Sequence, residues 1–334
     1  MKEILNHLFE HNTLTKSEAE EILLQITSGI YSPSQVGSFL TVFRMRSITV
    51  DELEGFRDAM LKQCIRIDLD EYDTVDLCGT GGDGKDTFNI STLASFVVAG
   101  AGVKVAKHGN YGVSSVCGSS NVLESLGIVF SNDHGMLRRN LETAGICFLH
   151  APMFHPAMKY VAPIRRELGV KTFFNMLGPM VNPSMPRHQL VGVFSLELAR
   201  LYSYLYQKSE KRYSIVHSLD GYDEVSLTGP FKVISKHEER LYETHDLGWD
   251  RLTAVAIAGG KDVESSAELF MRVLQGKGTD QQNRVVIINA AMAIQCVRDK
   301  AGLHECIDEA TTSLMSGKAL RSFQLLKANV GSGA

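Results

Sequence analysis

An apolar run, a glycine-rich loop and a second apolar run follow one another over residues 74–101, and this succession constrains the fold most. Residues 74–78 are typical of a short buried strand, and residues 91–101 are typical of a buried helix. Residues 103–106 then predict a second buried strand. Strand, helix and strand in this order form a right-handed βαβ unit, so the segment predicts an α/β fold with a parallel sheet.

Later strand-like and helical patterns extend this sheet. Further strands are predicted at residues 146–149, 190–194, 213–216 and 254–258. Helices are predicted at residues 121–126, 264–275, 283–297, 303–315 and 320–327. We therefore expect residues 69–334 to form one larger α/β domain, with a mostly parallel sheet flanked by helices.

The first 68 residues carry the start signals of short helices. Three pairs of residues have the spacing of a capping box, in which each side chain bonds to the other residue's backbone N–H. The pairs are Thr15 with Glu18, Ser32 with Gln35, and Thr49 with Glu52. We expect a small helical domain over residues 1–68, with a segment near residues 165–185 also packing on it.

Composition excludes several classes of protein. The formal net charge is −4, with 34 basic and 38 acidic residues, whereas proteins that bind mainly nucleic acid usually carry a basic surplus. No apolar run approaches the roughly 20 residues of a membrane span, and the mixed, acidic N-terminus is not a secretory signal. The six cysteines show no paired spacing, which favours reduced thiols in the cytoplasm.

The loop from Gly79 to Gly84 is the most informative segment for function. It nearly fits a P-loop, but Lys85 is followed by Asp86 instead of the Ser or Thr that would hold magnesium. A dinucleotide-binding loop needs a carboxylate after the next strand, and that strand is followed by Lys107 and His108. Two interpretations remain open: an anion-binding loop at a helix N-terminus, or a tight turn that binds nothing.

A second polar loop follows the second strand in the equivalent place. Lys107 offers a charge, glycines permit close backbone approach, and side chains offer hydrogen-bond donors; the last group comprises Asn110, Ser114, Ser115 and Ser119. Ser119 or Ser120 is expected to cap the helix that begins near Asn121. Alone, this segment is typical of a solvated loop. Two such loops at neighbouring strand ends predict instead a cradle for a doubly phosphorylated ligand.

Asp223 and Glu224 follow the turn signal Asp220-Gly221, between expected strands at residues 213–216 and 225–227. They fit an acidic hairpin turn, or alternatively the oxygen ligands of two hard cations.

Residues 157–168 predict an amphipathic helix with Arg165 at the edge of its apolar stripe. Such an arginine is usually a surface side chain, although its planar fork suits a carboxylate.

Four stretches together closely resemble the anthranilate phosphoribosyltransferases: GTGGDG with TFNIST, KHGN with the following SS and GSS, HPAMKYVAPIRRELGVKTFFNMLGPMVNP, and GYDEVS at residues 221–226. The resemblance implies transfer of phosphoribose from phosphoribosyl pyrophosphate to the amine of anthranilate, in tryptophan biosynthesis. It implies that the helical domain is followed in the sequence by an α/β domain of the nucleoside phosphorylase type. It also implies a homodimer packed through the helical parts, with no nucleic-acid or membrane partner.

The resemblance also implies the site residues. Those for phosphoribosyl pyrophosphate would be Gly79, Gly82, Asp83, Thr87, Asn89, Ile90, Ser91, Thr92, Lys107, His108, Gly109, Asn110, Ser114, Ser115 and Ser119. Those for anthranilate would be Gly79, Asn110, His155, Arg165 and Gly178. Two magnesium ions would be held by Ser91, Asp223 and Glu224. No covalent nucleophile is implied, and Lys107, Asn110 and Asp83 would act by positioning and electrostatics.

The chain departs from the family's pattern at two places. Tyr111 stands where the family commonly has an arginine after KHGN, and Ser120-Asn121 stands where it commonly has Ala-Asp. The lost arginine removes a cation beside the substrates, which bears on substrate affinity more than on the reaction class. One rival is a pyrimidine nucleoside phosphorylase, which shares the expected fold but resembles longer chains. The other rival is an inactive relative that binds nucleic acid.

Overall fold

The computed structural model describes residues 1–112 and 116–329. The chain divides into two compact units, each of which we describe by itself. One unit comprises Met1–Arg66 and Ala151–Pro183, and the other comprises Ile67–His150 and Ser184–Ala334. In the described part of the chain, no helix has the length and apolar character needed to cross a membrane.

The helical unit begins with four helices: α1 (Lys2–Phe9), α2 (Lys16–Thr27), α3 (Pro33–Met45) and α4 (Val50–Gln63). The three predicted capping boxes are confirmed, since α2, α3 and α4 begin after Thr15, Ser32 and Thr49 with both bonds of each box present. Because these bonds satisfy backbone N–H groups that a helix leaves unpaired, they define where each helix starts.

The second segment of the helical unit is longer than the one expected from the sequence, because it begins at Ala151 directly after the third strand. It contains α8 (Ala151–Phe154), η1 (Pro156–Tyr160), α9 (Ala162–Leu168), α10 (Phe174–Leu177) and η2 (Gly178–Met180). Phe173 joins it to the first segment by stacking on Phe56, with ring centroids 4.2 Å apart. Buried aromatic pairs of this kind contribute about 0.5–1.5 kcal/mol beyond the area they bury.

The single amphipathic helix predicted over residues 157–168 is wrong in one respect. The structure has a 3-10 turn, η1, followed by the separate helix α9, whose first turn contains Pro163. Proline has no backbone N–H, so it cannot bond to the carbonyl four residues earlier and is accommodated at a helix start. The break therefore falls just before the proline.

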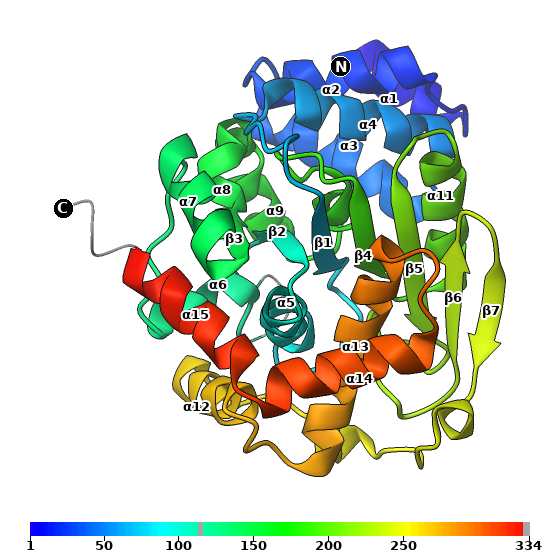
Figure 1. Cartoon of the computed structure of the whole chain (residues 1–334). Coiled ribbons are helices and arrows are strands. Elements are labelled where there is room, and N and C mark those ends of the chain that lie inside the picture. The colour runs from blue at the N-terminus through cyan, green and yellow to red at the C-terminus, as the bar shows by residue number, and fades with distance from the viewer. Residues whose placement is uncertain (113–115, 330–334) are drawn as a thin grey trace. The chain divides into compact units, whose positions relative to one another are not determined.

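The other unit is built on a seven-stranded sheet with the order β3-β2-β1-β4-β5-β6-β7. The strands are β1 (Thr74–Gly79), β2 (Lys104–Gly109), β3 (Ile146–His150), β4 (His188–Gly192), β5 (Arg212–Ser218), β6 (Phe231–Ser235) and β7 (Glu239–Tyr242). The first five are parallel, and β6 and β7 add an antiparallel hairpin at one edge. The predicted mostly parallel sheet is confirmed, and Figure 1 shows its strands running through the unit.

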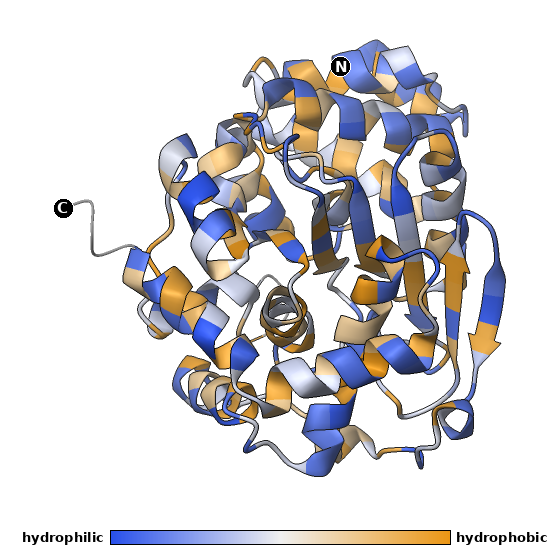
Figure 2. Cartoon of the chain, viewed as in Figure 1, coloured by the Kyte–Doolittle hydropathy of each residue, from blue (hydrophilic) through white to orange (hydrophobic). Residues whose placement is uncertain are grey.

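Helices flank this sheet. They are α5 (Ile90–Gly100), α6 (Ser119–Ser125), α7 (His134–Ala144), α11 (Leu196–Gln207), α12 (Val263–Leu274), α13 (Asp280–Val297), α14 (Leu303–Met315) and α15 (Lys318–Asn329). Helix α5 packs against β1, β2 and α13, and it is apolar around most of its circumference, as Figure 2 shows. A helix without a polar face belongs in the interior, so α5 forms the centre of the core.

Three local predictions in this unit are wrong. The run at residues 254–258 forms the 3-10 turn η4 (Ala254–Ile257) instead of a strand. Residues 225–227 do not pair with β5; Leu227 has φ of +59°, which no strand residue adopts, and β6 pairs with β5 instead. Neither Ser119 nor Ser120 caps α6, because the helix already begins at Ser119 and Gly118 is its N-cap residue.

Candidate functional site

The two polar loops lie at neighbouring strand ends, as predicted. Strands β1 and β2 are adjacent and parallel, so the loops that follow them leave the same edge of the sheet. The two loops are also bonded to each other, because Nδ2 of Asn89 donates to the carbonyl of Cys117 at 2.9 Å. Asn89 is the residue before α5, and its side chain makes this bond instead of capping the helix.

The glycine loop needs its glycines for conformation. Gly81, Gly82 and Gly84 have φ of +67°, +75° and +74°, a region that side-chain-bearing residues rarely adopt. The C-terminal part of the loop is held by η4, since the N–H of Phe88 donates to Ile257 at 3.3 Å. Space is open around Gly81 and Gly84, where an added Cβ would meet nothing within 4 Å. The loop is thus braced on one side and open on the other, as an anion-binding loop requires.

Asp223 and Glu224 do not form an exposed hairpin turn. Oδ2 of Asp223 accepts a hydrogen bond from the N–H of Gly81 at 2.6 Å, and Oε1 of Glu224 accepts one from the N–H of Ser91 at 2.9 Å. Asp223 therefore bonds to the glycine loop, and Glu224 bonds to the first turn of α5. The turn itself lies earlier, at Gly221, whose N–H donates to Ser218 at 2.8 Å.

Two glycines allow this close approach of the acid pair. A Cβ at Gly79, the last residue of β1, would lie 2.5 Å from Oδ2 of Asp223. A Cβ at Gly192, the last residue of β4, would lie 1.5 Å from the carbonyl oxygen of Asp223. Since no side chain fits at either position, the two strand ends form a glycine-lined seat for Asp223.

Burial shapes the electrostatics of the acid pair. It raises the pKa of Asp223 to about 7, and repulsion from Asp83 adds to the rise. Burial followed by repulsion from Asp223 also raises the pKa of Glu224 well above its usual range. The two carboxylates repel each other when both are ionised. A nearby cation would stabilise their charged forms. The oxygen donors present therefore fit a hard divalent cation.

A metal ion at this position would take only part of its ligands from the protein. Among the residues that the structure describes, no group of three or more His, Cys, Asp or Glu side chains is placed to hold a metal. Asp223, Glu224 and the hydroxyl of Ser91 remain the candidate protein ligands. Magnesium typically binds this way, through one or two carboxylates together with waters and substrate phosphates.

Lys107 contacts both the strand before the glycine loop and the helix after it. Its side chain is only 2% exposed, and its ammonium donates to the carbonyl of Leu77 near the end of β1. The ammonium also lies 3.5 Å from Oγ of Ser91, and its charge partly offsets the raised pKa of Glu224. The lysine thus favours the charged form of Glu224 and links the start of α5 to β1.

The second loop is tied together around Asn110. The N–H of Asn110 donates to Oγ of Ser119 at 3.2 Å, and the carbonyl of Asn110 accepts from the N–H of Ser120 at 3.1 Å. Oδ1 of Asn121 accepts from the N–H groups of Gly112 and Gly118 at 2.9 and 3.0 Å. Ser114 and Ser115 lie outside the described residues.

Other residues expected at the phosphate site turn their side chains inward. Ile90, Thr92 and His108 are buried, so only their backbone groups can face a ligand. The N–H of His108 is already used by Oδ1 of Asp76, at 3.1 Å. The expected residues therefore divide into loop positions that face outward and core positions that support them.

Three of the acceptor residues expected from the sequence, His155, Arg165 and Gly178, lie in the helical unit, whereas Gly79 and Asn110 lie in the other unit. Arg165 is half-buried, whereas its neighbour Arg166 is exposed, so the structure distinguishes two arginines that the sequence pattern cannot. Nη2 of Arg165 donates to Oδ1 of Asn175 at 3.3 Å, and the guanidinium lies 5.2 Å from the ring centroid of Phe174. Burial lowers the pKa of Arg165. A guanidinium stacked in this way is oriented, which favours recognition of a planar carboxylate.

His155 and Gly178 also belong to the helical unit. His155 is buried, and its Nε2 is hydrogen-bonded to the carbonyl of Val181 at 3.0 Å. Gly178 begins η2, where an added Cβ would meet nothing within 4 Å. The histidine therefore has a structural partner, while the glycine leaves open space.

Sequence reasoning missed Gly192 and Asn289. Oδ1 of Asn289, on α13, accepts from the N–H of Val225 at 3.1 Å, and its Nδ2 donates to the carbonyl of Val225 at 2.8 Å. This pair of bonds holds the backbone directly after the acid pair. The residues concerned are 64 positions apart, so no local pattern could have indicated the contact.

Comparisons with known proteins agree with this geometry. Residues 71–320 match the a/b domain of a glycosyl transferase family, and residues 2–64 match the helical bundle domain of the same family. The anthranilate phosphoribosyltransferase of Flavobacterium johnsoniae is 62% identical over 98% of this chain and 99% of its own length. That of Bacteroides thetaiotaomicron is 52% identical over 97% of this chain and 98% of its own.

Solved structures show the same fold. The anthranilate phosphoribosyltransferase of Thermus thermophilus superposes with a TM-score of 0.91 at 32% identity, over 98% of this chain and 99% of that one. The enzyme of Saccharomyces cerevisiae in complex with phosphoribosyl pyrophosphate and magnesium superposes with a TM-score of 0.90 at 28% identity, over 98% and 97% of the two chains.

Proposed function

The chain belongs to the anthranilate phosphoribosyltransferase family of glycosyl transferases, and from this membership we infer its reaction. It transfers phosphoribose from phosphoribosyl pyrophosphate to the amine of anthranilate. The products are N-(5-phosphoribosyl)anthranilate and pyrophosphate, in tryptophan biosynthesis. The relatives from Flavobacterium and Bacteroides are both anthranilate phosphoribosyltransferases, and this chain aligns with nearly their whole lengths.

One observation of this chain carries the proposal. Asp223 bonds to Gly81 across 142 residues and Glu224 bonds to Ser91 across 133, which puts the buried carboxylate of Asp223 on the glycine loop and the half-buried carboxylate of Glu224 on the first turn of α5. A loop of N–H groups suits a pyrophosphate, and adjacent carboxylates suit the cation that accompanies it. A plain turn would need neither the burial of the acids nor the glycine seat around them.

The proposed chemistry is a displacement at C1 of the ribose. The anthranilate nitrogen bonds to C1 as the bond between C1 and the pyrophosphate oxygen breaks, and the nitrogen releases a proton to water. Backbone N–H groups of the glycine loop and the positive end of α5 stabilise the departing negative charge. Asn110 orients the substrates, Asp83 shapes the field of the glycine loop, and Lys107 keeps Ser91 and the strand end in place.

Magnesium would be held by Ser91, Asp223 and Glu224, and we propose two ions. When bound, it supplies positive charge that neutralises the pyrophosphate. The magnesium complex of the Saccharomyces enzyme supports use of this ion.

For the acceptor, we propose Arg165 as the partner of the anthranilate carboxylate, with Gly178 supplying room for the ring and His155 beside it.

The test is the loss of anthranilate fluorescence when the chain is mixed with anthranilate, phosphoribosyl pyrophosphate and magnesium. We expect turnover that stops when magnesium is chelated. The rival reaction is phosphorolysis of thymidine or uridine with inorganic phosphate. Phosphorolysis without consumption of anthranilate would overturn the proposal in favour of a nucleoside phosphorylase.

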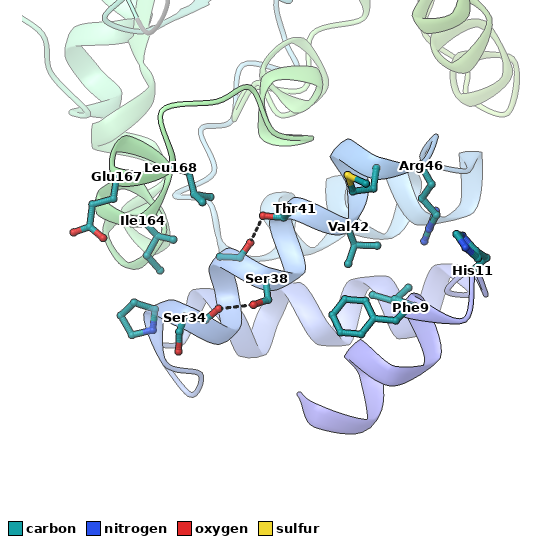
Figure 3. Close-up of a pocket in the computed structure, with 14 residues that line it drawn as sticks. Phe9, His11, Ser34, Ser38, Thr41, Val42, Arg46, Ile164, Glu167 and Leu168 are labelled. Atoms are coloured by element: carbon teal, nitrogen blue, oxygen red, sulfur yellow. Dashed lines mark hydrogen bonds between the residues drawn. The ribbon is translucent and has the colours of Figure 1, made fainter.

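We propose that the protein is a homodimer packed through its helical unit. Helices α1, α3 and α9 line a largely apolar groove of about 850 Å³, shown in Figure 3. Phe9 and Met45 line it with 59% and 84% of their surfaces exposed, so the groove presents apolar surface to solvent. A second copy presenting the same face would cover both residues.

Light scattering tests the dimer. We expect wild type to have twice the mass of one chain and Met45→Glu to shift to single chains. Val255→Glu is the matched control, since Val255 is equally exposed but lies in the other unit. A single-chain mass for wild type at micromolar concentration would contradict the proposal.

We further place the enzyme in the cytoplasm, a location supported by its six free cysteines.

A further inference from the structure

Tyr111, in the second polar loop, and Ser120, in α6, meet at one side chain, His150. Oγ of Ser120 is hydrogen-bonded to Nδ1 of His150 at 2.8 Å. The ring of Tyr111 packs edge-on against the same imidazole, with centroids 4.9 Å apart and an interplanar angle of 81°. Two residues that are nine positions apart in the sequence therefore contact the same imidazole.

His150 is itself held rigidly. It is the last residue of β3, so its backbone belongs to the sheet next to β2. Its ring stacks on Phe130 with centroids 4.5 Å apart and an interplanar angle of 19°. The side chain is buried, and this burial lowers the pKa of His150, which keeps the imidazole neutral at neutral pH. A rigid, neutral ring is a suitable anchor for a neighbouring loop.

Short connections join this anchor to Asn110. Ser120, which is bonded to His150 through its hydroxyl, donates its N–H to the carbonyl of Asn110 at 3.1 Å. Tyr111 follows Asn110 directly, and its N–H donates to Oδ1 of Asn110 at 2.8 Å. The conformation of Asn110 thus depends on two neighbours that both rest on His150.

The tyrosine is engaged on both sides. Its hydroxyl donates to Oε1 of Glu124, on α6, at 3.3 Å, while its ring contacts His150. The aromatic ring and hydroxyl therefore bridge the loop to α6. An arginine at position 111 would bring a charge next to Glu124 but could not reproduce the edge-on ring contact with His150.

We propose that His150 is a positioning residue that holds the loop of Asn110 in its substrate-binding conformation, acting through Ser120 and Tyr111. This inference rests on the proposed function. It assigns Tyr111 the task of supporting the loop instead of contacting substrate, and it makes the identities of residues 111, 120 and 150 interdependent. Tyr111→Arg alone is then expected to impair the enzyme.

A double-mutant cycle of Tyr111→Arg and His150→Phe tests the proposal. Phenylalanine keeps the stack on Phe130 and removes the bond to Ser120. Each single variant should raise the KM for phosphoribosyl pyrophosphate about tenfold, the loss expected when one hydrogen bond or one aromatic contact is removed. Because either change releases the same conformation of Asn110, the double variant should lose no more than about twofold beyond the worse single variant. Losses that multiply to about a hundredfold, or single variants with unchanged KM, would overturn the inference.

Controls separate positioning from folding and from failure of the proposed function. Tyr111→Phe removes the bond to Glu124, and Tyr72→Phe removes a similar bond to Glu142, at 2.7 Å, distant in sequence from both loops. Only Tyr111→Phe should raise the KM, while chemical unfolding midpoints of the two stay alike. If Tyr111→Phe and Tyr72→Phe change the KM equally, Tyr111 has only a structural role and the inference is wrong. If wild type does not turn over anthranilate, the proposed function fails, and the same cycle is then measured as calorimetric affinity for inorganic pyrophosphate with magnesium.

Discussion

Gly192→Ala is the substitution whose effect follows most directly from the geometry of the acid pair. An added Cβ would lie 1.5 Å from the carbonyl oxygen of Asp223, whereas real Cβ atoms essentially never come within 3.0 Å of another heavy atom. The backbone of Asp223 must therefore move away by at least about 1.5 Å. Gly192 has no left-handed φ, so alanine meets no backbone strain there and the effect is purely steric.

That displacement has two costs. Forcing an extra carbon into a packed site costs about 1–3 kcal/mol. Moving Asp223 also breaks its 2.6 Å bond from Gly81, and a hydrogen bond to a charged group contributes about 1.5–3 kcal/mol. We expect the free energy of unfolding to fall by about 3–5 kcal/mol. In the fraction that remains folded, the half-saturating magnesium concentration should rise at least about tenfold.

The assay combines guanidinium unfolding with initial rates of anthranilate consumption against magnesium. Gly302→Ala is the matched control, because a Cβ there meets nothing within 4 Å and the backbone already suits alanine. Gly302 is the residue before α14, so its replacement should cost at most about 1 kcal/mol and leave the magnesium titration unchanged. Superimposable unfolding curves and titrations for the two variants would refute the assignment of Gly192 as part of the seat for Asp223.

Three further predictions concern charge. Asp223→Asn combined with Glu224→Gln should fold normally by circular dichroism yet need at least about tenfold more magnesium for the same rate; an unchanged titration would return the pair to a structural role. Arg165→Ala should raise the KM for anthranilate and hardly affect aniline, which lacks the carboxylate; equal losses with both acceptors would contradict a carboxylate contact. Burial lowers the pKa of His150 below its ordinary 6.5, so the stability contributed by neutral His150 should be fully present above pH 6.5 and be lost as the pH falls from 6.5 to the folded-state pKa. His150→Phe should lack this loss in unfolding titrations, and parallel curves would show that His150 contributes no such dependence.

Local signals determined much of the fold from the sequence alone. The strand, glycine loop and helix near Gly79 follow from short-range preferences, because glycine adopts the left-handed φ values of that loop much more readily than other residues. The capping boxes at Thr15, Ser32 and Thr49 are likewise bonds between residues three apart. Adjacency of β1 and β2 follows from the βαβ rule, so the meeting of the two polar loops was predictable as well.

Only the tertiary structure decided how the site is completed. Nothing near Asp223 in the sequence distinguishes an exposed turn from a buried carboxylate bonded to a glycine 142 residues away. Strand β1 pairs with β4 as well as β2, and that pairing places Gly192 against Asp223. The meeting of Tyr111 and Ser120 at His150 likewise depends on β3 lying beside β2. Periodicity and capping act over a few residues, whereas burial, raised pKa values and shared contacts arise only when distant segments are packed together.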